Sequence, residues 1–224
     1  MRENDDALRF AYYGRDITRC LDRIHVRDMM SNTYKQAFDL VLGNEGGYSN
    51  DKDDPGGETY KGIARNRWPN WGGWEYIDFI KTSTKDPEKA FAFHGGLQTA
   101  IEKFYREHFW NVVWGDELDK LYPLLAIDVF DMAVNLGTGR AIEFIQRACN
   151  ALNNNQKLYP DILIDGSFGN RTLITVQKCV QIRGAELLYK VVNILQGAWY
   201  VSLMERNLIY EKYVGWFKRV DFIR

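Results

Sequence analysis

The chain has 224 residues, of which 46% are hydrophobic and 26% are charged, and its formal net charge is -1. This length can bury a core in one large domain, or in a main domain with a small appendage. The near-neutral charge argues against nucleic-acid binding through clustered Lys and Arg, and no apolar run approaches the roughly 20 residues of a membrane-spanning helix.

Residues 1–29 form an N-terminal extension for which two interpretations stay open. Its apolar residues recur at steps of three and four, at Phe10, Tyr13, Ile17, Cys20 and Ile24. This spacing is typical of an amphipathic helix. Met29 and Met30 offer alternative starts, so the segment also fits a flexible extension with no packed role.

A first helix is predicted just before Glu45. Apolar residues recur at helical steps from Tyr34 to Leu42, behind cap candidates at Ser31 to Thr33. Glu45 lies one turn beyond Val41, so its side chain should emerge from the apolar stripe of the helix. A carboxyl group in that position is poorly solvated. Poor solvation favours the neutral carboxyl and raises its pKa toward the range of a general acid.

Asp54 follows Glu45 nine residues later, in a polar loop with other acids, and should stay ionised. Two carboxyl groups with different environments are the arrangement that glycosidic bond cleavage requires. The alternative is structural: Glu45 caps a helix, and the loop acids are solvated surface.

The run from Glu45 to Tyr48, followed by Asp54 to Gly57 and Thr59 to Ile63, resembles the signature of the glycoside hydrolase 108 muramidases of the wider lysozyme superfamily. The similarity continues, in the family's order, through Ala126–Gln146, the DG-x-x-G-x-x-T turn within Ile164–Leu173, and Gly215–Val220. It covers roughly Ser31 to Arg224. The second of these segments resembles the family's predicted peptidoglycan-binding region.

This resemblance implies roles for three residues. The family's glutamate is the catalytic acid, which here is Glu45. A similarity to phage lysozymes implies that Asp54 is the second carboxylate and that Thr59 lies beside the attacking water. Because Tyr60 and Lys61 stand where the phage pattern has one residue, either Thr59 or Tyr60 could face the cleft.

The middle of the chain is aromatic. Gly and Pro interrupt the stretch from Trp68 to Tyr76, so its rings are either a sugar platform or a hydrophobic loop folded on the core. A helix is expected over Ile101–Phe109, with Trp110 as a candidate for the cleft wall.

A buried central helix is predicted over Pro123–Leu136, because apolar residues surround its axis and Gly137 suits its end. Asp128, Asp131 and Asn135 nevertheless fall on one face, which must meet either partner donors or a cleft. The expected substrate-binding residues are Tyr48, Tyr60, Trp71, Trp110, Asp131 and Asn135.

The chain after Arg140 is predicted to be helical to Leu152, with an internal boundary in the polar stretch that follows. Three further helices, over Thr172–Val180, Ala185–Leu203 and the aromatic tail, have too little polar surface to stand alone. We therefore expect a mainly α, lysozyme-like catalytic domain at residues 30–155. The peptidoglycan-binding helical region at residues 156–224 should dock closely on it.

The leading hypothesis is a muramidase that cleaves the β-1,4 bond between N-acetylmuramic acid and N-acetylglucosamine in peptidoglycan glycan strands. The alternative is a non-catalytic protein of wall binding or secretion. No metal or cofactor is expected, because the three cysteines and three histidines form no ligand motif. A monomer is favoured. Without a recognisable signal peptide, synthesis is expected in the cytoplasm, with release or export by another factor.

Overall fold

The computed structural model describes residues 33–43, 47–51 and 56–220. The α-helices are α3 (Thr33–Leu42), α4 (Gly73–Ser83), α5 (Pro87–Phe93), α6 (Gly95–Tyr105), α7 (Gly115–Leu121), α8 (Pro123–Leu136), α9 (Thr138–Leu152), α10 (Asn170–Arg183) and α11 (Ala185–Arg206). A π-helix, η2 (Arg106–Trp110), extends α6, and a kinked 3₁₀ segment, η3 (Leu208–Arg219), follows α11. Strands β1 (Tyr48–Ser49), β2 (Thr59–Tyr60) and β3 (Ile63–Ala64) form an antiparallel sheet.

The predicted mainly α, lysozyme-like fold is confirmed. The extension at residues 1–29, Glu45 and Asp54 lie outside the described residues.

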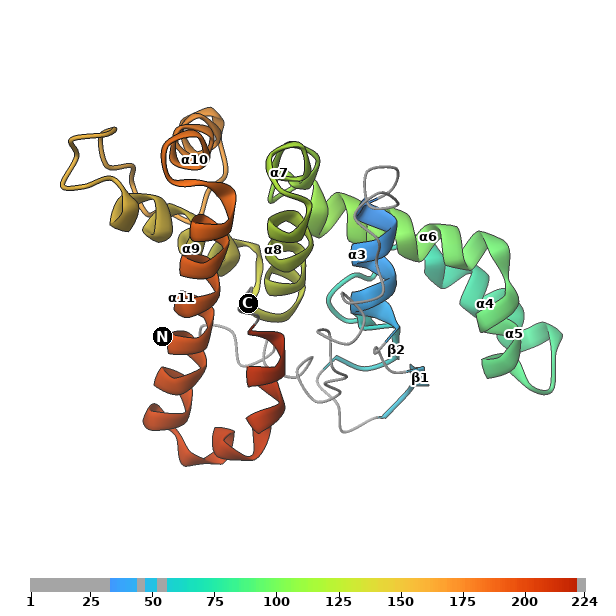
Figure 1. Cartoon of the computed structure of the whole chain (residues 1–224). Helices are drawn as coiled ribbons and strands as arrows, with labels where there is room; N and C mark the ends of the chain where they lie inside the picture. Colours follow the sequence, from blue (N-terminus) through green and yellow to red (C-terminus); the bar gives the residue numbers. More distant parts are fainter. Residues whose placement is uncertain (1–32, 44–46, 52–55, 221–224) are drawn as a thin grey trace.

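Helix α8 is the centre of the molecule, as its sequence predicts. Pro123 opens it, and Gly137 ends it with a positive φ of 88°, a backbone conformation that favours glycine. Figure 1 shows α3 to α6 on one side of α8 and α9 to α11 on the other. Within the part of the chain that the structure describes, no helix has the length and apolar character needed to cross a membrane.

The polar stripe of α8 faces the C-terminal helices. Asn193 of α11 donates a hydrogen bond to the Asp128 carboxylate at 2.7 Å, and Arg219 of η3 pairs with Asp131 at 2.5 Å. The Asn135 amide donates to the backbone and side chain of Asp131. Asp131 and Asn135 are therefore buried in a packing interface, and their expected role in substrate binding is not retained.

The Asp131–Arg219 pair is almost fully enclosed, with side chains 5% and 7% exposed. Burial raises the pKa of Asp131, while the Arg219 charge and the hydrogen bond from Asn135 act in the opposite direction. Such a pair ties distant parts of a chain together, because neither charge is tolerated alone in the interior.

We expect Arg219→Met to lower the free energy of unfolding by about 3–5 kcal/mol, because it leaves the Asp131 carboxylate buried without its partner. Lys218→Met, which removes an exposed neighbouring charge, should change stability by less than about 0.5 kcal/mol. Adding Asp131→Asn to Arg219→Met should restore much of the loss. Urea unfolding measures all three, and equal effects of the two single variants would contradict the role of the pair.

The C-terminal helices share one core with the rest of the molecule. Trp216, Tyr200 and Tyr189 are at most 1% exposed, and they join the same hydrophobic cluster as the residues of α3 and α8. Trp114, just before α7, stacks on Phe168 with ring centroids 5.6 Å apart. The expected close docking of the C-terminal helices is confirmed.

Candidate active site

A short hairpin follows the predicted catalytic residue Glu45 in the chain. Strand β1 pairs with β2 so that Tyr48 lies opposite Tyr60. Lys61 and Gly62 connect β2 to β3, and both have positive φ, 47° and 76°. Positive φ at both central residues is the requirement of a type I′ turn, and glycine meets it without strain. The Tyr105 hydroxyl donates to the Lys61 carbonyl at 2.8 Å, which fixes the turn against α6.

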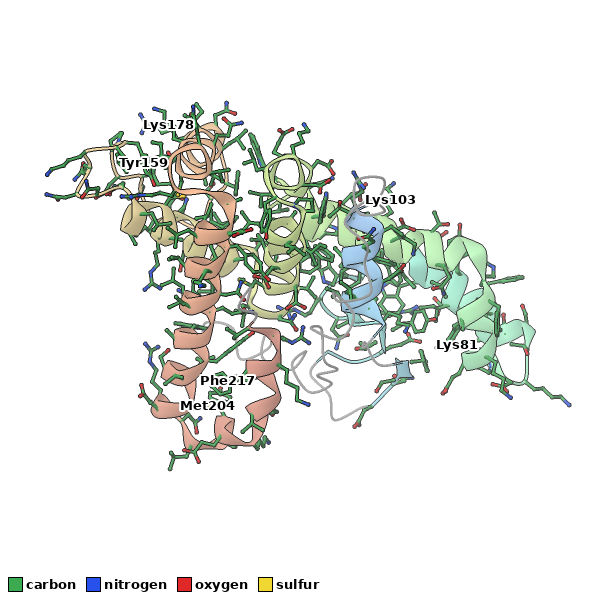
Figure 2. All side chains as sticks on the ribbon, viewed as in Figure 1. Lys81, Lys103, Tyr159, Lys178, Met204 and Phe217 are labelled. Carbon is green, nitrogen blue, oxygen red and sulfur yellow. The ribbon has the colours of Figure 1, made fainter. Side chains whose placement is uncertain are left out.

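Glu58, just before β2, links the hairpin to α4. Its carboxylate accepts hydrogen bonds from the Tyr48 hydroxyl and the Lys81 ammonium, each at 2.7 Å. Its second oxygen lies 3.0 Å from Nε of Arg65, and the side chain is only 9% exposed. The hydrogen bond to Glu58 raises the pKa of Lys81, which Figure 2 labels on α4, beside the hairpin. Glu58 therefore binds one neutral and two cationic partners around the base of the hairpin.

Replacing this carboxylate should loosen the hairpin. We expect Glu58→Gln to cost about 1–3 kcal/mol of stability, because hydrogen bonds to a charged, enclosed group are among the stronger ones. Asp78→Asn is the control: Asp78 also pairs with Arg65 at 2.8 Å, but its side chain is 53% exposed, so its loss should cost under about 1 kcal/mol. Urea midpoints compare the two, and a loss from Asp78→Asn as large as that from Glu58→Gln would contradict this account.

An open groove with aromatic walls lies next to the hairpin turn. It consists of two adjoining hollows of ≈ 330 and ≈ 320 Å³, which share Arg67, Trp68, Phe104 and His108. Gly62 of the hairpin turn and the α8–α9 turn border the first hollow, and Trp71 borders the second. We call this surface the aromatic groove.

The rings of the aromatic groove are held in a cluster. Trp68, which is 36% exposed, lies against His108 with ring centroids 4.4 Å apart and meets Phe104 edge to face at 4.9 Å. His108 belongs to the π-helix η2, and π-helical turns inside helices are frequent at functional sites. Aromatic faces bury the apolar side of a sugar ring while their edges remain wet. Sequence periodicity could not reveal this cluster, because its members come from separate elements.

The structure distinguishes Thr59 from Tyr60. Tyr60 is 3% exposed, and its ring packs against Phe91 at a centroid distance of 5.3 Å. Thr59 points to the opposite face of β2, is partly exposed, and donates its hydroxyl hydrogen to the Gly57 carbonyl at 3.1 Å. Of the two, Thr59 has the accessible side chain, and Tyr60 belongs to the core.

The other expected sugar contacts have different environments. Trp71 is half-buried at the edge of the aromatic groove. Tyr48 is also partly exposed, but Glu58 accepts a hydrogen bond from its hydroxyl. Trp110 is 1% exposed, and its indole N–H donates to Asp116 at 2.8 Å. No ring face of Trp110 is open to a glycan, so it is a core residue and is left out of the site proposed below.

Among the residues that the structure describes, no three His, Cys, Asp or Glu side chains meet in a group that could hold a metal ion.

The small hairpin against a mainly helical body, with a groove alongside, defines a lysozyme-like protein. Residues 38–137 match the family model described as glycosyl hydrolase 108, and residues 140–221 match the predicted peptidoglycan domain. Over the first of these ranges the chain is similar to the glycosyl hydrolase 108 family. Together the two matches support a glycoside hydrolase that acts on peptidoglycan. They adjoin at the α8–α9 turn, and the internal boundary expected after Asn155 stays a prediction.

Among solved structures, the chain is similar to Brucella abortus SagA, with 22% sequence identity and a TM-score of 0.47. That similarity covers 83% of this chain and 96% of the SagA chain. No curated protein matches the sequence.

Proposed function

We propose that this protein is a muramidase that hydrolyses the β-1,4 bond between N-acetylmuramic acid and N-acetylglucosamine, with Glu45 as the general acid. Glu45 protonates the leaving oxygen, and Asp54 orients water or stabilises the oxocarbenium-like transition state. The match of residues 38–137 to the glycosyl hydrolase 108 family model supports the reaction class. Glu45 and Asp54 both fall inside that match.

The pairing of β1 with β2 is the observation that best supports this assignment. Glu45 comes three residues before Tyr48, and Asp54 comes five residues before Thr59. In the antiparallel register Ser49 lies opposite Thr59, and Tyr48 lies opposite Tyr60. The first strands that follow Glu45 and Asp54 in the chain are therefore neighbours in one small sheet.

Thr59 and the aromatic groove complete the proposed site. Thr59 is an accessible hydroxyl on β2, suited to a water molecule that attacks the sugar. Gly62 follows it in the hairpin turn and also borders the aromatic groove. We place the glycan strand along this groove, with Trp68 and Trp71 against sugar rings.

The bond that is cleaved can be read from the product. Purified peptidoglycan digested with the wild-type protein should release fragments with N-acetylmuramic acid at the new reducing end, as identified by reduction and mass spectrometry. New ends at N-acetylglucosamine would show a glucosaminidase. An absence of new reducing ends would favour the alternative of a non-catalytic wall protein.

The anomeric form of the product tests the role of Asp54. If Asp54 orients water, the two carboxyl groups are roughly 6.5–9.5 Å apart in the closed site, and the product is inverted. We expect this inverted anomer in NMR spectra recorded during the first minutes of the reaction, before mutarotation. A retained anomer would instead make Asp54 a nucleophile, at a separation of about 5 Å.

A further inference from the structure

A second hollow lies far from the hairpin, on the other side of α8. It has a volume of ≈ 760 Å³ and lies between α10 and the loop that joins α9 to α10. Its lining includes Asp161, Leu163, Asp165, Arg171, Ile174 and Lys178. Figure 2 labels Tyr159 and Lys178, two residues of this lining, at the α10 end of the molecule. We call this surface the C-terminal groove.

The loop wall of the C-terminal groove is fixed by amide side chains of α9. The Gln146 oxygen accepts from the backbone N–H groups of Asp165 and Gly166, and its NH₂ group donates to the Asp165 carboxylate at 2.8 Å. One turn further on, Asn150 makes two hydrogen bonds with the backbone of Ile162. These contacts explain why an irregular loop can form a defined wall, and they preform the groove before any ligand binds.

The helical wall is cationic. Arg171 and Lys178 are two turns apart on α10, so they lie on the same face of the helix, with Ile174 between them. Both are exposed, and no carboxylate of the described residues lies within 4.0 Å of either cationic group. Two cations in a concave wall, neither of them in an ion pair, are suited to bind carboxylates.

The opposite wall is acidic. Asp165 accepts hydrogen bonds from Gln146 and from the backbone N–H of Ser167, and these lower its pKa. Asp161 accepts from Asn153 at 2.5 Å. Between the charged groups lie two exposed apolar side chains, Leu163 at 76% and Ile174 at 50%. The groove therefore presents cations, anions and apolar surface to one ligand.

We propose that the C-terminal groove binds the peptide stem of peptidoglycan. Stem carboxylates pair with Arg171 and Lys178, the ammonium group of a diamino acid faces Asp161 or Asp165, and alanine methyl groups cover Leu163 and Ile174. The N-acetylated sugars of a glycan strand carry no cation that could pair with the acidic wall, and a polyphosphate carries only negative charge. The inference rests on the proposed function for its substrate, and it agrees with the peptidoglycan domain match at residues 140–221.

Binding is measured by calorimetry on the full chain carrying Glu45→Gln, so that hydrolysis does not interfere. The probes are a free stem tetrapeptide containing a diamino acid, and the uncharged disaccharide of N-acetylglucosamine. We expect Arg171→Gln/Lys178→Gln to weaken tetrapeptide binding by at least about tenfold, which is typical of losing hydrogen bonds to charged groups. The control is Lys190→Gln/Arg206→Gln, which removes the same charges from exposed positions on α11 and should leave binding unchanged.

Amide NMR shifts of the unmodified groove give a second measurement that needs no groove variant. The tetrapeptide should shift the signals of Arg171, Thr175 and Lys178, while the bare disaccharide should leave them in place. The proposal would be overturned if both double variants bound the tetrapeptide equally well. It would also be overturned if the tetrapeptide shifted signals elsewhere but none on α10. Wall hydrolysis by the chain with Glu45 intact is assayed separately. Its failure would remove the proposed function without altering the binding result.

Discussion

A fragment that ends at Leu158 should be insoluble. The deleted part contributes Leu188, Tyr189, Val192, Tyr200 and Trp216, all at most 1% exposed, to the core shared with α8 and α9. Burying each such side chain contributes roughly 1.5–3 kcal/mol, so together they rival the stability of a typical domain. Deletion would also leave Asp128 and Asp131 without the donors from Asn193 and Arg219. We expect the fragment to appear in the pellet after expression, or to lack a cooperative melting transition.

Co-expression is the control for this deletion. A second chain that supplies residues 159–224 should restore soluble material, because it returns the same buried surface and the same donors. A fragment ending at Leu158 that is soluble, melts cooperatively and loses only wall affinity would contradict this account. The C-terminal region would then be a detachable binding domain.

The sequence predicts the helices well where apolar spacing and end signals agree. Pro123 and Gly137 bound the predicted central helix, and α8 has the same limits. The helix predicted to end at Leu152 is α9, which begins at Thr138. The aromatic tail forms the kinked 3₁₀ segment η3. Local periodicity is sufficient to predict such helices, because a helix with a buried face needs apolar residues at every third or fourth position.

The partners of buried polar groups could not be predicted in this way. The polar face of the predicted central helix indicated that Asp131 needs either a donor or a cleft, but it did not identify the donor. The donor is Arg219, 88 residues further along the chain. Periodicity shows that a side chain is inside, but the identity of its neighbour depends on the tertiary packing of distant helices.

The candidate site shows the same limit. Trp110 looked like a cleft wall by its place in the sequence, yet Asp116 satisfies its indole N–H in the core. No sequence pattern singled out Glu58, but in the structure it binds Tyr48, Lys81 and Arg65 around the hairpin. The motif that contains Glu45 and Asp54 was recognisable because it is continuous. The aromatic groove was not, because it is assembled from separate elements.

The most direct test of the central claim is wall hydrolysis by Glu45→Gln. The amide keeps the size and hydrogen bonding of the side chain but cannot supply a proton, so the release of reducing ends from purified peptidoglycan should fall by about 10²–10⁴-fold. Glu75→Gln, at an exposed position in the first turn of α4, is the matched control and should keep full activity. Unchanged melting curves must accompany the loss. If folded Glu45→Gln hydrolyses peptidoglycan as fast as the wild type, Glu45 is not the general acid.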